Sequence, residues 1–295
     1  MLLQEKMRVT SFSSSEQLIV DFMLEKQDAI KEYSTTMIAE ETYTSASMLV
    51  RIAKKLGFHG YQELKEAFLQ EVMYLRTNFQ NINANLPFLA TDTQLDIAGK
   101  LRKLKQESLF DTLQLLDPAK LQKAIKILEN SETIHVFAIS NMTFQAEEFV
   151  FKMRHIGKSA QTYSISNMLY QEALMAAEHD CAICISYSGE TGELLETMNI
   201  LKGKQLPIIA ITSIGQNSLT KLADVQLSLT TREKAYSKIA GFSSLESISF
   251  LLDIIYSCYF ATNYQKHYTY KTKVAQASEQ RHIDNHIVRE DVITE

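Results

Sequence analysis

Apolar residues recur at three- and four-residue spacing along the first quarter of the chain and predict a compact helical unit over residues 11–78. Ser13 and Glu16 have the spacing of a capping box, and the stripe that begins at Leu18 follows directly. Gly57 is expected to end one helix in a left-handed conformation. The predicted helices cover an early segment that includes residues 18–23, then 35–41, 46–56 and 61–75.

From residue 118 onward the pattern changes to apolar runs that alternate with helical segments. The predicted strands are 134–139, 160–165, 181–186, 207–212 and 225–229. The predicted helices are 118–129, 144–156, 168–177, 192–202, 218–223 and 242–260. Such alternation builds an α/β fold, in which a mostly parallel sheet lies between two layers of helices, as in flavodoxin-like and Rossmann-like proteins. Ligands of such folds bind at the carboxyl ends of the strands.

The two patterns predict a two-domain chain with an all-α N-terminal domain and an α/β C-terminal domain. We expect a helical domain at 1–78, a linker and connecting helix at 79–117, the α/β domain at 118–264, and a polar tail at 265–295. The most apolar helix, 242–260, could be covered by a second copy of the chain, but burial in the core of its own domain is slightly favoured.

Composition adds few constraints. The net charge of −5 argues against a protein that coats nucleic acid by bulk charge, although a local basic face remains compatible with it. The polar start of the chain does not resemble a signal peptide, and we expect no membrane-spanning segment, hence a cytoplasmic protein. Cys181 and Cys184 form a C-x-x-C spacing, but on a strand they point to opposite faces, so buried structural cysteines are expected.

The segment between the strand at 181–186 and the following helix is rich in hydroxyl groups. Ser186, Ser188 and Thr191 supply three donors, Gly189 allows close approach of the backbone, and Glu190 lies between them. Backbone N–H groups and the helix dipole favour an anion at such a turn, so a phosphate is the expected guest. The alternative is a capped helix without a ligand, for which one hydroxyl would be enough.

This stretch, Ser-Tyr-Ser-Gly-Glu-Thr, resembles the phosphosugar-binding signature of the SIS (sugar isomerase) domain, over about residues 121–264. The resemblance implies a second contact at the end of the first strand, where the family has a glycine-rich turn with a serine. Here Ala138 and Ser140 replace the glycines and Met142 replaces the serine. Asn141 and Thr143 could supply the missing hydrogen bonds to the sugar.

The predicted helices 35–41 and 46–56, joined by a tight turn, have the plan of a helix-turn-helix. The second helix is expected to expose Ser45, Ser47, Met48, Arg51, Lys54 and Lys55 toward DNA. Lys and Arg can contact phosphates, and Arg51 could also read a base edge. The alternative is that these cations only complement the helix dipole, since residues 1–78 hold nine Lys plus Arg against eleven Asp plus Glu.

The run from Arg51 to Lys65, with its Lys-Leu-Gly-Phe-x-Gly-aromatic-x-Glu-Leu-Lys core, resembles the helix-turn-helix of the RpiR family of bacterial regulators. This sequence departs from the family at Tyr43, where the family has its turn glycine, and at Met48, where the family has a threonine. The first change suggests an altered turn, and the second an altered operator preference.

Both resemblances together imply a non-enzymatic, DNA-binding regulator of carbohydrate metabolism that senses a sugar phosphate, with double-stranded operator DNA as its partner. A homodimer or homotetramer is expected, and neither a cofactor nor a metal. One alternative is a phosphosugar aldose–ketose isomerase with a helical oligomerisation domain, for which Glu190, Glu193 and Glu246 are the nearest candidate acids or bases. Another is a regulator that has lost its ligand.

Overall fold

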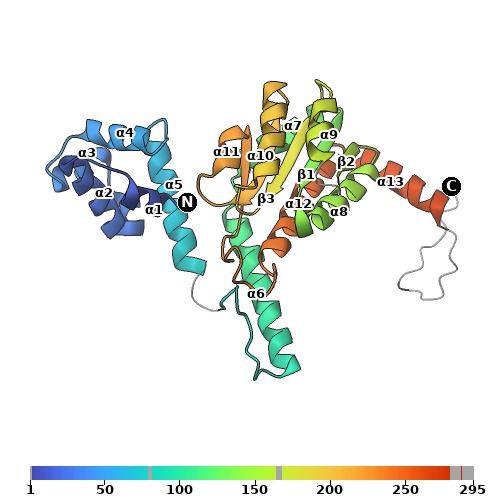
Figure 1. Ribbon diagram of the computed structural model, residues 1–295, viewed down its shortest axis with the longest axis horizontal. Helices are drawn as coiled ribbons and strands as arrows, with labels where there is room; N and C mark the ends of the chain where they lie inside the picture. Colours follow the sequence, from blue (N-terminus) through green and yellow to red (C-terminus); the bar gives the residue numbers. More distant parts are fainter. Residues whose placement is uncertain (1, 79–81, 164–167, 280–286, 288–295) are drawn as a thin grey trace.

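The computed structural model describes residues 2–78, 82–163, 168–279 and 287, and it places them in a small helical lobe and a larger α/β lobe (Figure 1). The helical lobe consists of α1 Leu3–Val9, α2 Ser14–Lys26, the 3₁₀ helix η1 Gln27–Glu32, α3 Thr35–Glu41, α4 Ala46–Lys55 and α5 Tyr61–Asn78. One shared core, which includes the fully buried Ile19, Ile52 and Phe68, holds them together. The lobe is therefore a small folded unit built from the predicted apolar stripes.

Local signals placed the ends of these helices correctly. The Ser13 side chain accepts from the backbone N–H of Glu16, while the Glu16 carboxylate accepts from that of Ser13, which completes the predicted capping box. Gly57 has φ +90° and ends α4. Helices α1 and η1 were not predicted, since each is too short to show a repeated apolar pattern. Leu3 and Met7 of α1 pack in the core of the lobe, and the Glu71 carboxylate accepts from the N–H groups of Leu3 and Gln4 at 2.5 and 2.8 Å.

The α/β lobe is built on five strands, β1 Thr133–Ala138, β2 Ser159–Thr162, β3 Cys181–Ser186, β4 Ile208–Ser213 and β5 Val225–Leu229. They form one sheet in the order β2-β1-β3-β4-β5, and every neighbouring pair is parallel. This confirms the predicted α/β fold. In this order the chain reverses its direction of winding between β1 and β3, and ligands of open α/β sheets bind at that point.

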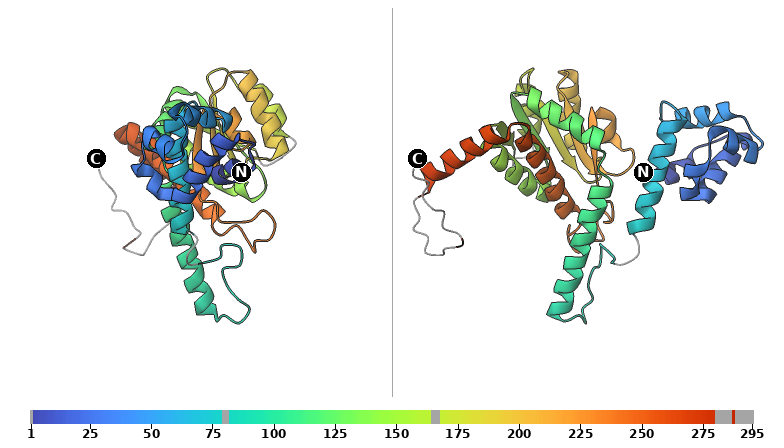
Figure 2. Two further views of the ribbon diagram at one scale, coloured as in Figure 1. Left: turned by 90° about the vertical axis from the view of Figure 1, so that its left-hand side faces the viewer. Right: turned by 180° about the vertical axis from the view of Figure 1, so that it is seen from behind.

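Helices cover both faces of the sheet (Figure 2). One face carries α7 Pro118–Asn130, α8 Thr143–Arg154 and α12 Ser244–Thr262, and the other carries α9 Leu169–Met175, α10 Gly192–Gly203 and α11 Ser218–Leu222. Cys181 contributes to the core of the first face and Cys184 to that of the second, as their odd spacing predicts. Burial raises the pKa of both thiols, Cys181 to about 11, which fits structural cysteines.

Helix α6 Gln94–Gln114 connects the two lobes and extends beyond the sheet (Figure 1). Its second half packs on the α/β lobe, where the Ser108 hydroxyl lies 2.6 Å from that of Ser243. Arg232, which follows β5, donates to Asp111 at 2.5 Å and to Glu107 at 2.6 Å. The Asp111–Arg232 pair is almost completely buried and fixes α6 to the lobe.

The last two helices bear on two separate expectations. By length and hydropathy α12 could cross a membrane, although no stretch of the sequence was expected to do so. Within the described structure its Ile248, Leu251 and Ile255 are buried in the core of the α/β lobe, so the core interpretation of this helix holds. The predicted polar tail begins with a regular helix, α13 Tyr264–Ser278, which is anchored by a bond from His267 Nδ1 to the carbonyl of Phe260 at 2.9 Å.

Candidate functional site

The turns that follow β1 and β3 emerge side by side from the carboxyl edge of the sheet. Ala138, the last residue of β1, is paired with Ile185 of β3, and Ser186 is paired with Thr212 of β4. The predicted signature turn, 186–191, and the predicted second contact, 138–143, therefore start from adjacent positions. Both lie at the point where the winding of the sheet reverses, which is the usual ligand position in this architecture.

Within the signature turn, hydroxyl and backbone groups bond to one another. Ser186 Oγ lies 3.1 Å from Thr191 Oγ1 and accepts from the backbone N–H of Gly189 at 3.1 Å, while Ser188 Oγ accepts from that of Glu190 at 3.2 Å. Ser186 is buried, Thr191 is half-buried and Ser188 is exposed. The turn is thus ordered by its own donors, the same groups that would hold an anion.

Gly189 is the residue of this turn that only glycine can fill. Its φ is +67°, and a Cβ added there would lie 2.1 Å from Cγ of Asn217. Asn217 is held by two bonds of its own, from Nδ2 to Thr212 Oγ1 at 3.0 Å and from the Thr220 N–H to Oδ1 at 3.0 Å. Asn217, the N-cap residue of α11, therefore also packs against the signature turn.

Helix α10 points its N-terminus at the turn. Its N-cap residue, Thr191, makes no side-chain capping bond, so that side chain leaves the first backbone N–H groups of the helix without their usual partner. The Glu190 carboxylate instead accepts from the backbone N–H of Ser218 at 2.9 Å. Hydrogen bonds from Ser218 hold the pKa of Glu190 below its usual range. An exposed helix N-terminus with adjacent hydroxyls is suited to a phosphate.

The first turn keeps the backbone of a glycine turn although its glycines are replaced. Ser140 has φ +62°, a left-handed conformation that glycine adopts most readily. Thr143 Oγ1 donates to the carbonyl of Ser140 at 2.7 Å, and Asn141 is exposed. The sequence change therefore alters the side chains offered here and preserves the left-handed residue.

A segment after β5, which sequence reasoning did not identify, is fastened to the signature turn. The Tyr187 hydroxyl accepts from the backbone N–H of Glu233 at 2.9 Å and donates to the Glu233 carbonyl at 3.1 Å. Lys238 pairs with the Glu233 carboxylate at 3.0 Å, and its ammonium lies 5.0 Å from the centre of the Tyr187 ring. No periodic pattern marks residues 230–243, so these contacts had no local signal.

On the helical lobe, the predicted DNA-contact face of α4 is only partly free. Ser45, Ser47, Arg51 and Lys54 are exposed, and the Ser45 and Ser47 hydroxyls lie 2.9 Å apart. Ser45 occupies the N-cap position, but its side chain makes no capping bond. Serine is a favoured N-cap residue, but here the Ser45 hydroxyl bonds to Ser47 and not to the backbone of α4.

Two further predicted contacts are placed differently from the rest. Met48 is half-buried against the lobe's core, because it lies four residues before the buried Ile52, at the edge of the apolar stripe. Lys55 is exposed but binds Glu16 at 2.6 Å. That bond, followed by one from the Ser13 N–H, lowers the pKa of Glu16 to about 2. Of the cations on α4, Arg51 and Lys54 form no ion pair within the part of the chain that the structure describes.

The turn before α4 keeps the left-handed conformation that a glycine would give. Tyr43 has φ +51°, and its side chain is 97% exposed. Replacing the family's glycine by Tyr43 therefore changes the side chain at this turn and keeps the backbone conformation. A left-handed conformation costs a non-glycine residue about 1–2 kcal/mol of stability. Among the described residues no group of three His, Cys, Asp or Glu side chains is arranged to hold a metal ion.

Each of the two lobes matches a known protein family. Residues 1–73 match the helix-turn-helix domain of the rpiR family, and residues 127–257 match the SIS domain. The first match includes α3 and α4, and the second includes β1 through β5 with the signature turn.

Two curated relatives are similar along most of their length. An uncharacterised HTH-type transcriptional regulator of Haemophilus influenzae is 27% identical over 249 residues, 84% of this chain and 85% of the relative. Another, from Caldanaerobacter subterraneus subsp. tengcongensis, is 24% identical over 276 residues, 94% of this chain and 96% of the relative.

Solved structures share the fold. The Vibrio vulnificus NanR protein complexed with ManNAc-6P has a TM-score of 0.58 at 19% identity and covers 93% of this chain and 97% of its own. The sugar isomerase domain of an RpiR transcription factor from Sphaerobacter thermophilus has a TM-score of 0.55 at 13% identity, over 61% of this chain and 98% of that chain.

A helix-turn-helix lobe joined to a SIS domain defines the class of transcriptional regulators that carry a sugar-isomerase-type sensory domain. The relatives that align with both lobes are HTH-type transcriptional regulators. The chain belongs to the RpiR family of these regulators.

Proposed function

We propose that this chain regulates transcription by binding operator DNA through α4 and a phosphorylated sugar through the signature turn. The observation that carries the proposal is the turn itself: three hydroxyls, a glycine that tolerates no side chain, and the N-terminus of α10 converge at the ligand position of the sheet. Sugar binding changes operator affinity by its differential affinity for two conformations of the protein.

The phosphate is assigned to Ser186, Ser188, Gly189, Glu190 and Thr191. Glu190 contributes its backbone N–H, since its carboxylate would repel the anion. Asn141 and Thr143, at the neighbouring turn, are assigned to the sugar hydroxyls. The structural relative from Vibrio vulnificus is complexed with ManNAc-6P, so hexosamine 6-phosphates are the first ligand class to test.

Ser45, Ser47, Met48, Arg51, Lys54 and Lys55 form the proposed DNA face. In this proposal Arg51 and Lys54 make the charged contacts with DNA, and Lys55 positions α4 through its ion pair with Glu16. Because a single helix-turn-helix seldom gives enough affinity, we propose that a homodimer or homotetramer reads paired half-sites. Analytical ultracentrifugation of the native chain would measure its oligomeric state.

The proposal excludes turnover of the sugar. Of the three candidate acids or bases, Glu190 is bonded to Ser218 and Glu246 is paired with Lys105 at 2.6 Å, so both carboxylates are already engaged. Glu193, the third, lies in the first turn of α10 and is the residue to substitute if turnover is found. The competing function, an aldose–ketose isomerase, predicts interconversion of a sugar phosphate in a coupled assay. A regulator acting on DNA is expected in the cytoplasm.

The experiment is a thermal-unfolding screen of sugar phosphates, ManNAc-6P included, on the native chain and on Ser188→Ala. Ligand at about a hundred times its Kd stabilises by about 2.7 kcal/mol, or a Tm rise of roughly 5–10 °C for a domain of this size. Non-phosphorylated N-acetylmannosamine is the matched control ligand. We expect one phosphosugar to raise Tm in the native chain only; equal shifts in both proteins would place the ligand elsewhere.

A further inference from the structure

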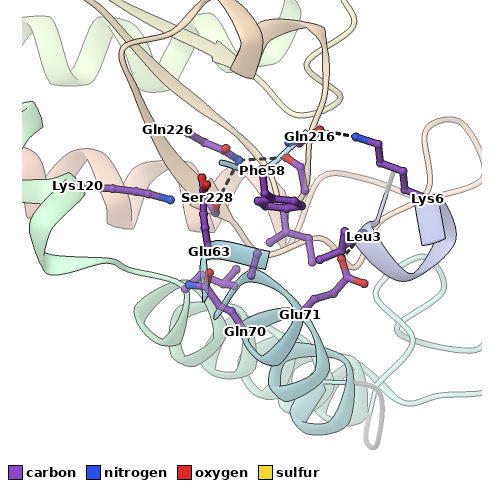
Figure 3. Close-up of a pocket in the computed structure, with 14 residues that line it drawn as sticks. Leu3, Lys6, Phe58, Glu63, Gln70, Glu71, Lys120, Gln216, Gln226 and Ser228 are labelled. Carbon is purple, nitrogen blue, oxygen red and sulfur yellow. Dashed lines mark hydrogen bonds between the residues drawn. The ribbon is translucent and has the colours of Figure 1, made fainter. Parts of the chain in front are cut away.

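The two lobes meet through a small contact around a cavity. Leu2 packs on Leu115 and Ile214, which are buried together. Beside them lies a cavity of about 230 Å³, lined by α1 and α5 of the helical lobe and by the segment after β4 (Figure 3). Domains joined by small interfaces tend to move relative to one another. An apolar cluster of this size is expected to let the two lobes separate.

One side chain bridges the two lobes beside this cavity. The Lys6 ammonium donates to Oε1 of Gln216 at 2.8 Å (Figure 3). It also donates to the carbonyl of Leu56 at 2.6 Å. Leu56 is the C-cap residue of α4, the proposed DNA-reading helix, and carbonyls at that end lack intrahelical partners. A cation there also complements the helix dipole. Lys6 thus ties the end of α4 to the α/β lobe.

Gln216 lies next to residues that hold the signature turn. Asn217 packs against Gly189, the N–H of Ser218 donates to the Glu190 carboxylate at 2.9 Å, and the N–H of Leu219 donates to the Gly189 carbonyl at 3.0 Å. Three consecutive residues after Gln216 therefore contact the turn. A continuous set of contacts runs from the turn through this loop and Lys6 to α4.

We infer that the Lys6–Gln216 hydrogen bond is the contact through which occupancy of the signature turn reaches the DNA-reading helix. The inference rests on the proposed function of the turn and adds the set of contacts by which ligand binding there affects α4. A phosphate at the turn brings negative charge beside the Glu190 carboxylate and weakens the Glu190–Ser218 bond. The loop then shifts, Gln216 moves from Lys6, and the helical lobe is released.

Charge at the contact favours this release. The pKa of Lys6 is lowered, first by burial and then by the charge of Lys221 on α11. Because Lys221 repels the Lys6 ammonium, Lys6 is kept in place by its hydrogen-bond acceptors, the Leu56 carbonyl and Gln216 Oε1. Loss of the bond to Gln216 removes one of these two acceptors. Repulsion between Lys6 and Lys221 therefore acts in the direction of release.

The contact itself is tested without ligand by small-angle X-ray scattering. Gln216→Ala removes the acceptor and is expected to increase the radius of gyration. Gln216→Glu keeps an acceptor oxygen for Lys6, adds a charge to the bond, and is expected to leave the radius unchanged. Gln114→Ala, at the exposed end of α6, is the matched control. Equal radii for Gln216→Ala and Gln114→Ala would overturn the inference.

The route is tested by amide hydrogen exchange in residues 46–58, which contain α4 and its end. Glu190→Ala, which frees Ser218, is expected to speed exchange there about fivefold, the factor for one lost hydrogen bond. Unchanged exchange would overturn the inference whether or not a ligand binds. Inorganic phosphate is expected to have the same effect on the native chain, and none on Ser188→Ala or Gln216→Ala.

Thermal scans with inorganic phosphate separate the two possible failures. Stabilisation of the native chain but not of Ser188→Ala, with unchanged exchange in 46–58, would leave the proposed binding site standing and overturn the coupling. Absence of stabilisation would count against the proposed site for inorganic phosphate, and the Glu190→Ala comparison would then decide the coupling alone.

Discussion

Gly189→Ala tests the geometry of the signature turn most severely. The new Cβ would lie 2.1–2.4 Å from three atoms of the Asn217 side chain, far inside contact distance. The left-handed φ of +67° costs an alanine about 1–2 kcal/mol. Displacing Asn217 also removes the N-cap of α11, worth about 0.5–2 kcal/mol. The expected loss of stability is therefore about 1.5–4 kcal/mol.

Gly192→Ala provides the control within the same segment. A Cβ at Gly192 would meet nothing within 4 Å, and its φ is not left-handed, so the expected change is below about 0.5 kcal/mol. The assay is thermal unfolding followed by circular dichroism, with and without an effective sugar phosphate. We expect only Gly189→Ala to lower Tm and to abolish the ligand-induced rise. Similar Tm values for both variants would refute the reasoning about crowding at Gly189.

Three further predictions concern other parts of the molecule. Arg51→Ala should reduce by about 1 the slope of log affinity for DNA against log salt concentration, while Lys31→Ala, outside the helix-turn-helix, should not; equal slopes would contradict the assignment. Arg232→Met leaves the buried Asp111 carboxylate unpaired and should cost about 3–5 kcal/mol in denaturant unfolding; a loss below 1 kcal/mol would show that Asp111 is otherwise compensated. Because the folded pKa of Glu16 is depressed to about 2, its stabilising effect is complete above about pH 4.5 and is lost as the pH falls toward 2. Glu16→Gln should thus cost about 1 kcal/mol at pH 7 and progressively less from pH 4.5 to 3; a constant difference would contradict the ion-pair explanation.

Much of the fold followed from local patterns in the sequence. Apolar runs such as 181–186 identify buried strands, and the Ser13–Glu16 and Gly57 signals mark helix ends, because these structures depend on neighbouring residues. Contacts between distant residues leave no such trace. Lys6 and Gln216 are separated by 210 positions, and neither belongs to a recognisable motif.

The same contrast between local patterns and distant contacts applies to the candidate sites. The signature turn could be identified from one hexapeptide, since its donors are contiguous. The restraint on Lys55 by Glu16 and the packing of Asn217 on Gly189 required the folded chain. Met48 was assigned to the exposed face because it lies at the border of the apolar stripe, where periodicity alone does not decide burial.

The most direct measurement of the central claim is DNA affinity with and without the ligand. Fluorescence anisotropy would follow binding of the native chain and of Ser188→Ala to a duplex selected by the native protein from random sequences. The account predicts that one phosphosugar changes the affinity of the native chain, leaves that of Ser188→Ala unchanged, and acts only when phosphorylated. An unchanged affinity in the native chain, with a sugar phosphate shown to bind at the turn, would contradict it.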